Sequence, residues 1–284
     1  MYTNIVEPEV LAQHLHDANW RVVDCRFSLA DSSAGHQEWR DGHIPGAVYA
    51  NLDQHLAAPV AKGDGRHPLP SVRDFARRLG AWGISEGTQV VAYDAAGGAF
   101  AARLWWLLRW IGHEAVAVLN GGLPAWQEAG FALDDELPEP ASTTFTPAPR
   151  NDMAVGPRQM RKLQASGDAL LLDARDAERF MGDREPLDTK AGHIPGARNF
   201  PFSANLDADG RFLDAGRLRA CFDAALQGAQ PSSVVMMCGS GVTACHNLLA
   251  MELAGLHGAR LYPGSWSQWI TDPSRPVASG PAMA

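Results

Sequence analysis

The sequence contains few cysteines and none of the cysteine spacings that define common frameworks. Its 284 residues include four cysteines, and no two of them form a Cys-x-x-Cys pair. This argues against a disulfide scaffold, a zinc site and a thioredoxin-like redox role, so we expect neither a metal nor a cofactor. The four are Cys25, Cys221, Cys238 and Cys245.

The chain also lacks excess positive charge and any long apolar run. It has 24 basic and 32 acidic residues, a net charge of −8, which argues against nucleic acid or an anionic membrane as a partner. The N-terminus has no basic or apolar leader, and the most apolar stretch, residues 100–111, is interrupted by Arg103 and Arg109. We expect a cytoplasmic protein without a membrane partner, and we predict a monomer.

One hexapeptide occurs twice: GHIPGA stands at residues 42–47 and again at 192–197. Short apolar segments surround both copies in the same order, at 22–24 and 171–173 before them and at 90–94 and 234–238 after them. Helical patterns alternate with these segments, which is typical of parallel sheets covered by helices. The sequence therefore predicts an α/β fold of two tandem domains, each a mainly parallel sheet flanked by helices on both faces.

The repeat also predicts the domain boundaries. The first domain should span residues 1–135 and the second 158–284, joined by a proline-rich linker at 136–157. Alignment of the halves puts Asp94 at the position of Cys238. Only the second domain therefore carries a candidate nucleophile.

Two of the expected helices begin at residues suited to capping. Ser71 precedes the helical pattern at 71–82, and Asp214 precedes the one at 214–226. Side-chain oxygens at such positions accept hydrogen bonds from the first free backbone N–H groups.

The segment VVMMCGSGVT, residues 234–243, is the main candidate for chemistry. Its apolar run predicts a buried strand, which places Cys238 at the carboxyl end, where open α/β sheets bind ligands. Gly239 and Gly241 allow a tight turn with inward N–H groups, and a helix is predicted at 243–253. These donors favour a thiolate. The alternative is a cysteine that is merely a small buried apolar residue.

With these features, the whole chain resembles the two-domain rhodanese family of sulfurtransferases. The loop CGSGVT is similar to the mercaptopyruvate-using branch, because thiosulfate-using members carry basic residues where this sequence has Gly239 and Ser240. The resemblance implies that Cys238 takes sulfur from the small-molecule donor 3-mercaptopyruvate as a persulfide and releases pyruvate. The sulfur would then pass to cyanide or to a thiol acceptor such as thioredoxin or glutathione.

The resemblance also implies a proton donor and a substrate-binding loop. Ser240, His67 and Asp53 match a Ser-His-Asp arrangement that protonates the departing enolate. Each residue type is also common in turns and caps, so a purely local role is the alternative. The implied substrate-binding loop residues are Gly239, Gly241, Val242 and Thr243.

The carboxylate of the donor is bound well by a planar guanidinium. The resemblance implies that Arg179 is the arginine that binds it. The alternative for Arg179 is a surface ion pair with a neighbouring acid, which contributes little energy. The acids considered for that pair are Asp176, Glu178 and Asp183.

A second family arginine has no counterpart at its usual place. It follows a Glu-Pro pair in several members, whereas Leu187 follows Glu185-Pro186 here. Arg184 and Lys190 are the candidates for replacing it.

Three other functions can be compared with the sequence. A cysteine phosphatase needs an arginine six residues after the nucleophile, and that position is Ala244. A thiosulfate:cyanide sulfurtransferase would share the persulfide and differ in the donor. A non-catalytic rhodanese-like binding protein would leave Cys238 unmodified.

Two sets of residues are expected to be structural. His43 and His193 lie in both copies of the repeat although only one half has the nucleophile, so we expect them to hold loops by hydrogen bonds. The tryptophans are expected to pack in the interior, with Trp266, near the site, as the exception.

Overall fold

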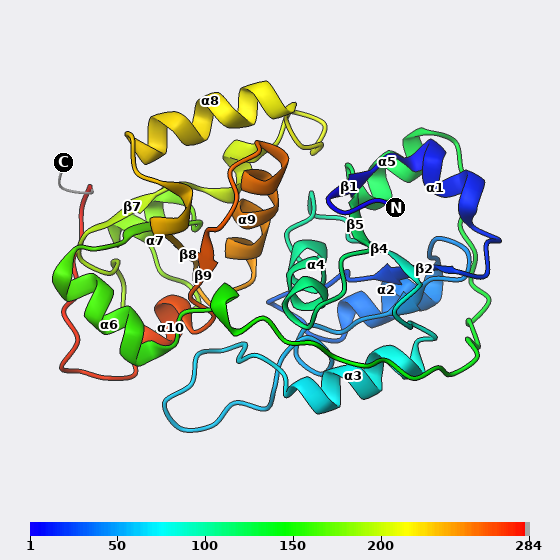
Figure 1. The fold of residues 1–284 in the computed structure, drawn as a ribbon, viewed down its shortest axis with the longest axis horizontal. Coiled ribbons are helices and arrows are strands. Elements are labelled where there is room, and N and C mark those ends of the chain that lie inside the picture. Colours follow the sequence, from blue (N-terminus) through cyan, green and yellow to red (C-terminus); the bar gives the residue numbers. More distant parts are fainter. Residues whose placement is uncertain (282–284) are drawn as a thin grey trace. The chain divides into compact units, whose positions relative to one another are not determined.

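The computed structural model describes residues 1–281 and divides into two compact units (Figure 1). The first unit contains residues 1–58, 69–150 and 207–212, and the second contains 59–68, 151–206 and the chain from 213 onward. The short segment 59–68 thus packs with the second unit, although the residues before and after it pack with the first.

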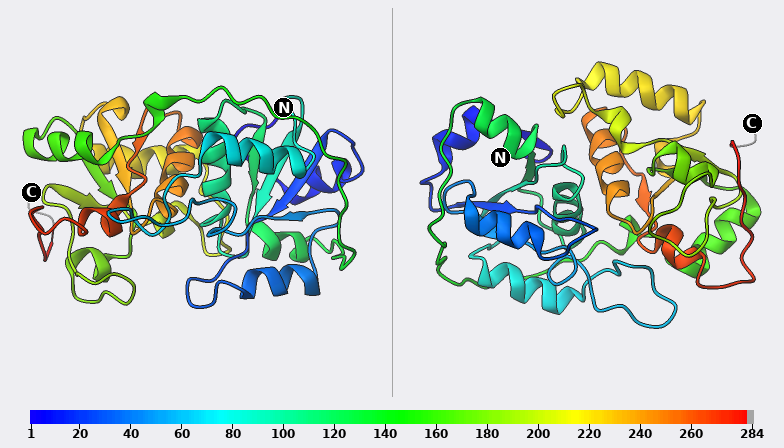
Figure 2. Two further views of the ribbon diagram at one scale, coloured as in Figure 1. Left: turned by 90° about the horizontal axis from the view of Figure 1, so that it is seen from below. Right: turned by 180° about the vertical axis from the view of Figure 1, so that it is seen from behind.

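The first unit is built on a parallel sheet with strand order β1-β5-β4-β2-β3. Helices lie on both faces of this sheet (Figure 2). The central strand β4 is buried along its whole length, and its three middle residues are two valines and an alanine, which suit a strand covered on both faces. The strands are β1 (Ile5–Val6), β2 (Trp20–Asp24), β3 (Val48–Tyr49), β4 (Gln89–Tyr93) and β5 (Val116–Leu119).

The helices of the first unit include the predicted one after Ser71. The Ser71 hydroxyl accepts the backbone N–H of Asp74 at 3.1 Å, which confirms the predicted cap. The helices are α1 (Pro8–His14), α2 (Ala34–Asp41), α3 (Val72–Ala81), α4 (Ala101–Trp110) and α5 (Gly122–Glu128).

The second unit repeats this design with strand order β7-β6-β8-β9, again parallel. The predicted strand at 234–237 and helix at 243–253 are confirmed. The strands are β6 (Leu170–Asp173), β7 (Ala197–Asn199), β8 (Val234–Met237) and β9 (Arg260–Leu261). The α-helices are α6 (Pro157–Ser166), α7 (Ala177–Met181), α8 (Ala215–Leu226), α9 (Thr243–Leu253) and α10 (Ser265–Trp269). Short 3-10 helices stand at Asn151–Met153, Phe202–Asn205 and Pro231–Ser233.

A buried ion pair fastens the repeated hexapeptide in each unit. Arg26 binds the Asp24 carboxylate, and Arg175 binds that of Asp173, with shortest N to O distances of 2.6 and 2.7 Å. Each guanidinium also donates to the carbonyl of the hexapeptide's first glycine. The two copies of the sequence motif therefore have the same local structure.

The two repeated histidines are structural, as predicted. The Nδ1 atom of His43 lies 2.7 Å from the carbonyl oxygen of Trp39, and that of His193 lies 2.8 Å from the carbonyl of Phe180. Both rings are buried. Each histidine thus links the start of its GHIPGA segment to the preceding helix.

Two features are absent from residues 1–281. No helix there is long and apolar enough to cross a membrane. In the same residues, no group of three or more His, Cys, Asp or Glu side chains could hold a metal ion.

Candidate active site

Cys238 directly follows β8, and its sulfur accepts the backbone N–H of Gly241 at 3.1 Å. Gly241 has a φ of +77°, and a Cβ there would lie 2.3 Å from the Pro263 carbonyl oxygen, so only glycine fits this turn. Cys238 is 2% exposed. The turn therefore places an N–H donor on a thiol that has little contact with solvent.

The equivalent loop of the first unit shows what this backbone binds. Asp94 follows β4 as Cys238 follows β8, which confirms the predicted equivalence. The Asp94 carboxylate accepts four backbone N–H bonds, at 2.8, 2.9, 2.8 and 2.8 Å, from Ala96, Gly98, Phe100 and Ala101. A strand-to-helix loop of this fold thus binds an anion in one unit, which supports a thiolate in the other.

Ser265 holds the nucleophile's own backbone. Its hydroxyl accepts the N–H of Cys238 at 3.1 Å and donates to the carbonyl of Tyr262 at 2.9 Å. Its φ is +51°, in the left-handed region, where the equivalent residue of the first unit is Gly122. A non-glycine residue there costs about 1–2 kcal/mol. The strain occurs where the hydroxyl positions Cys238.

Substitutions at Ser265 should separate these two effects. Ser265→Ala keeps the strain and loses the hydroxyl, whereas Ser265→Gly loses both. We expect both variants to lose about 3- to 10-fold in kcat/KM, consistent with one neutral hydrogen bond. Ser265→Gly should unfold at higher urea than Ser265→Ala. Equal stability of the two variants would contradict the strain, and unchanged kcat/KM would contradict the positioning role.

His67 and Ser240 lie together, as the resemblance implied. The Nδ1 atom of His67 is 2.7 Å from the Ser240 hydroxyl, and both side chains are buried. Both belong to the second unit, because the segment 59–68 packs there. A proton can therefore pass between these two groups.

Asp53 belongs to the first unit and lies just after β3. Its backbone N–H donates to the Asn51 side chain at 2.9 Å, and burial raises the pKa of its carboxyl. Its place in a Ser-His-Asp set stays a prediction.

Arg179 forms ion pairs, but not with the neighbours considered from the sequence. Its guanidinium donates to Glu185 at 2.7 Å and to Asp188 at 3.2 Å. Helix α7 ends at Met181, and Gly182, with a φ of +86°, turns the chain so that later residues return to this guanidinium. The alternative of a surface ion pair with Asp176, Glu178 or Asp183 is therefore replaced by pairs with Glu185 and Asp188.

The Glu185 carboxylate interacts with two arginines, Arg179 and Arg175. Burial favours its neutral form, but the hydrogen bonds from Arg179 and from the N–H groups of Leu187 and Asp188 outweigh burial and lower the pKa of its carboxyl. Glu185 also lies 3.4 Å from the guanidinium of Arg175. A fixed negative charge thus holds both arginines in place.

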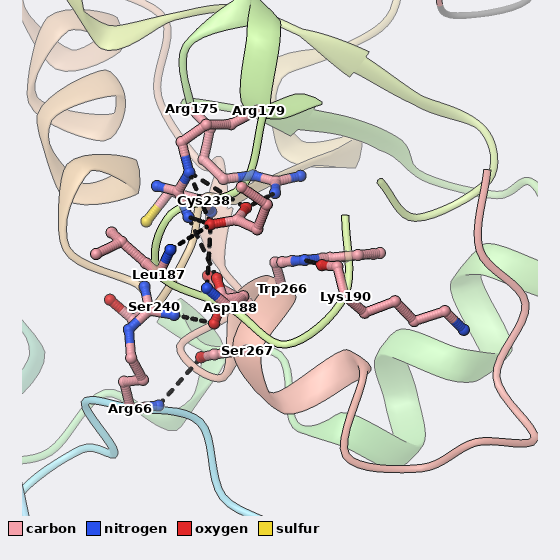
Figure 3. A network of polar contacts seen from close by, with 12 residues as sticks. Arg66, Arg175, Arg179, Leu187, Asp188, Lys190, Cys238, Ser240, Trp266 and Ser267 are labelled. Carbon is pink, nitrogen blue, oxygen red and sulfur yellow. Dashed lines mark hydrogen bonds and ion pairs between the residues drawn. The ribbon is translucent and has the colours of Figure 1, made fainter. Parts of the chain in front are cut away.

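Arg66 is a site residue that the sequence reading missed. Its guanidinium forms an ion pair with Asp188, and its backbone N–H donates to Ser267 at 3.1 Å (Figure 3). Its Nη2 atom lies 2.9 Å from the position that a Cβ would have on Gly239. Its one sequence signal was its place directly before His67.

The structure gives different information on the two expected replacements for the second arginine. Arg184 is exposed, and its backbone N–H donates to the carbonyl of Glu178. Lys190 is exposed, and its side chain points away from Cys238 in Figure 3. Binding of the donor by Arg184 stays a prediction.

The remaining predicted residues flank the loop. Val242 is buried, and Thr243 is the half-buried first residue of α9. Trp266 is fully buried, and the central carbon of the Arg175 guanidinium lies 5.0 Å from the centre of its ring, so Trp266 packs in the interior and the expected exception is wrong. Substrate contacts of Val242 and Thr243 stay predictions.

Comparison with known proteins places this site in a family. The model for the rhodanese-like domain matches residues 7–129 and 156–272. The chain is 47% identical over 278 residues to the "Probable 3-mercaptopyruvate sulfurtransferase" of Pseudomonas aeruginosa, covering 97% of this chain and 98% of the relative. It is 33% identical to a thiosulfate sulfurtransferase of Gallus gallus, covering 89% and 87% of the two chains.

Solved structures agree. The 3-mercaptopyruvate sulfurtransferase of Leishmania major superposes with a TM-score of 0.81 at 33% identity, over 93% of this chain and 73% of that one. The chain belongs to the rhodanese family and consists of two rhodanese-like domains. The predicted fold and enzyme class, a sulfurtransferase, are thereby confirmed.

Proposed function

We propose that this chain is a 3-mercaptopyruvate sulfurtransferase with Cys238 as its nucleophile. The observation that carries the proposal is the Cys238 sulfur beneath the backbone N–H of Gly241, with the guanidiniums of Arg66 and Arg179 beside the next residue. The two guanidiniums supply positive charge for an anionic donor, and the Cys238 sulfur is the atom that would react with the donor's sulfur.

The proposed reaction balances in two steps. The Cys238 thiolate attacks the thiol sulfur of the donor, an S–S bond forms, and the donor's C–S bond breaks. The bonding pair leaves as the enolate of pyruvate, which takes up one proton, while the donor's thiol proton is released from the persulfide. In the second step cyanide or a thiolate takes the outer sulfur and restores the Cys238 thiolate.

Ser240 and His67 are the proposed proton donors to the enolate. Their contact of 2.7 Å forms a relay that can deliver a proton to a buried carbanion and be reprotonated from the imidazole. Positioned proton transfer of this kind accelerates a step by about 10²- to 10⁴-fold.

The physiological setting is part of the same proposal. The acceptor is proposed to be a thiol such as thioredoxin or glutathione, or cyanide, and the enzyme a cytoplasmic monomer. Val242 and Thr243 are proposed to line the donor's path together with Gly239 and Gly241.

Thiosulfate is the second candidate donor. Two guanidiniums beside Gly239 suit the thiosulfate dianion as well as a carboxylate. The Gallus gallus relative is named a thiosulfate sulfurtransferase. The test is kcat/KM for both donors with cyanide as acceptor, because only differential binding of the transition state defines preference. We expect mercaptopyruvate to exceed thiosulfate by at least about 10-fold. A tenfold preference for thiosulfate would overturn the choice of donor.

A further inference from the structure

We propose that Arg66 supplies the second guanidinium that binds the donor's carboxylate. This inference rests on the proposed function and extends it to a residue from a different part of the sequence. It starts from the position of the Arg66 guanidinium next to Gly239, the residue that follows Cys238. Guanidinium groups are suited to binding a carboxylate, because they can donate two parallel hydrogen bonds to it.

The geometry places Arg66 beside Arg179 at one point. A Cβ on Gly239 would lie 2.9 Å from Arg66 Nη2 and 3.5 Å from both terminal nitrogens of Arg179. Residue 239 directly follows the nucleophile. Two guanidiniums therefore approach the same place next to the reacting sulfur, and only a residue without a side chain at position 239 lets them do so.

Asp188 holds this pair together. One of its oxygens binds Arg66 and the other binds Arg179, and its own side chain is only 4% exposed (Figure 3). Through this bridge each arginine is fixed by one of its terminal nitrogens. The Nη2 edge of Arg66 faces Gly239, so a bound carboxylate would lie against it.

The segment 59–68 brings Arg66 to this position. The Arg66 N–H donates to Ser267, the Gln268 side chain donates to the carbonyl of Gly63 at 3.2 Å, and His67 contacts Ser240. All of these partners lie in the second unit. The same short segment thus delivers the proposed proton relay and the proposed carboxylate ligand side by side.

A purely structural role is the alternative, because the ion pair with Asp188 also anchors this segment. The binding role and the anchoring role predict different effects of removing Arg66 on the use of an uncharged donor. If Arg66 binds the carboxylate, its removal should weaken use of 3-mercaptopyruvate far more than use of the uncharged methyl ester. If Arg66 only anchors the segment, its removal should weaken both donors equally.

The experiment measures kcat/KM for acid and ester with wild type, Arg66→Gln and Arg66→Lys, using cyanide as acceptor. Arg217→Gln, an exposed residue on α8, is the matched control. We expect Arg66→Gln to lose about 10- to 100-fold with the acid, mainly through a higher KM, and less than about 3-fold with the ester. Arg66→Lys, which keeps the charge without the fork, should lose less.

An unchanged ratio of acid to ester in Arg66→Gln would overturn the assignment while wild-type activity upheld the proposed function. If wild type itself did not use 3-mercaptopyruvate, the proposed function would fail and this assignment with it. Should Arg66→Gln fail to fold, Arg66→Lys still decides, because an acid-to-ester ratio equal to that of wild type would also contradict the assignment.

Discussion

Replacing Cys238 with serine is expected to lower kcat/KM by at least about 10⁴-fold, because a hydroxyl at this position cannot form the persulfide. The fold should persist, since the variant still fits beneath the Gly241 N–H and removes no packing atom beyond the difference between sulfur and oxygen. Mass spectrometry should show a gain of about 32 Da on Cys238 of wild type after exposure to donor, and none in Cys238→Ser.

The matched control is Cys221→Ser on α8, a half-exposed cysteine outside the loop. It should retain both turnover and the mass shift. A mass shift that followed Cys221, or substantial turnover in Cys238→Ser, would contradict the proposed mechanism. A wild-type Cys238 that never acquired sulfur would instead favour the non-catalytic binding protein.

Local signals in the sequence predicted the parts of the fold that are set locally. The run 234–237 is short and entirely apolar, and only a strand buried on both faces accommodates it. Asp214 caps α8 through a bond to the N–H of Arg217, as its type and place indicated. The repeat then predicted the larger order, because identical hexapeptides fold onto the same buried Asp-Arg pair in both units.

The site was predicted less completely, because its cations come from segments far apart in the sequence. Proximity to Arg179 along the chain pointed to Arg184 and Lys190. The fold instead brings in Arg66, which pairs with Asp188 from 122 residues away. Periodicity and capping report neighbours along the chain, so they carry no information about such a pair.

For Ser265, in contrast, the sequence did contain an indication of its role, namely the difference between the two halves at this position. The halves align Gly122 with Ser265, and a glycine replaced by serine at a left-handed position marks strain that the fold retains. Comparison of the two copies at that position would have pointed to the hydroxyl that holds Cys238.

Removing His67 is expected to have the second largest effect. His67→Ala and Ser240→Ala should each lower kcat for 3-mercaptopyruvate by about 10²- to 10³-fold, because both interrupt protonation of the same enolate. The double variant should be no slower than the slower single variant, since groups that act as one relay are not additive. His257→Ala, an exposed histidine of the second unit, is the control.

The half-reactions distinguish a proton relay from a structural contact. Transfer of sulfur from preformed Cys238 persulfide to cyanide releases no enolate, so it should change by less than about 10-fold in His67→Ala. Rapid-mixing measurements of pyruvate release and of thiocyanate formation give the two rates separately. If both rates fell together, His67 would serve to hold the loop through Ser240. If only pyruvate release fell, the 2.7 Å contact would be the path of the proton.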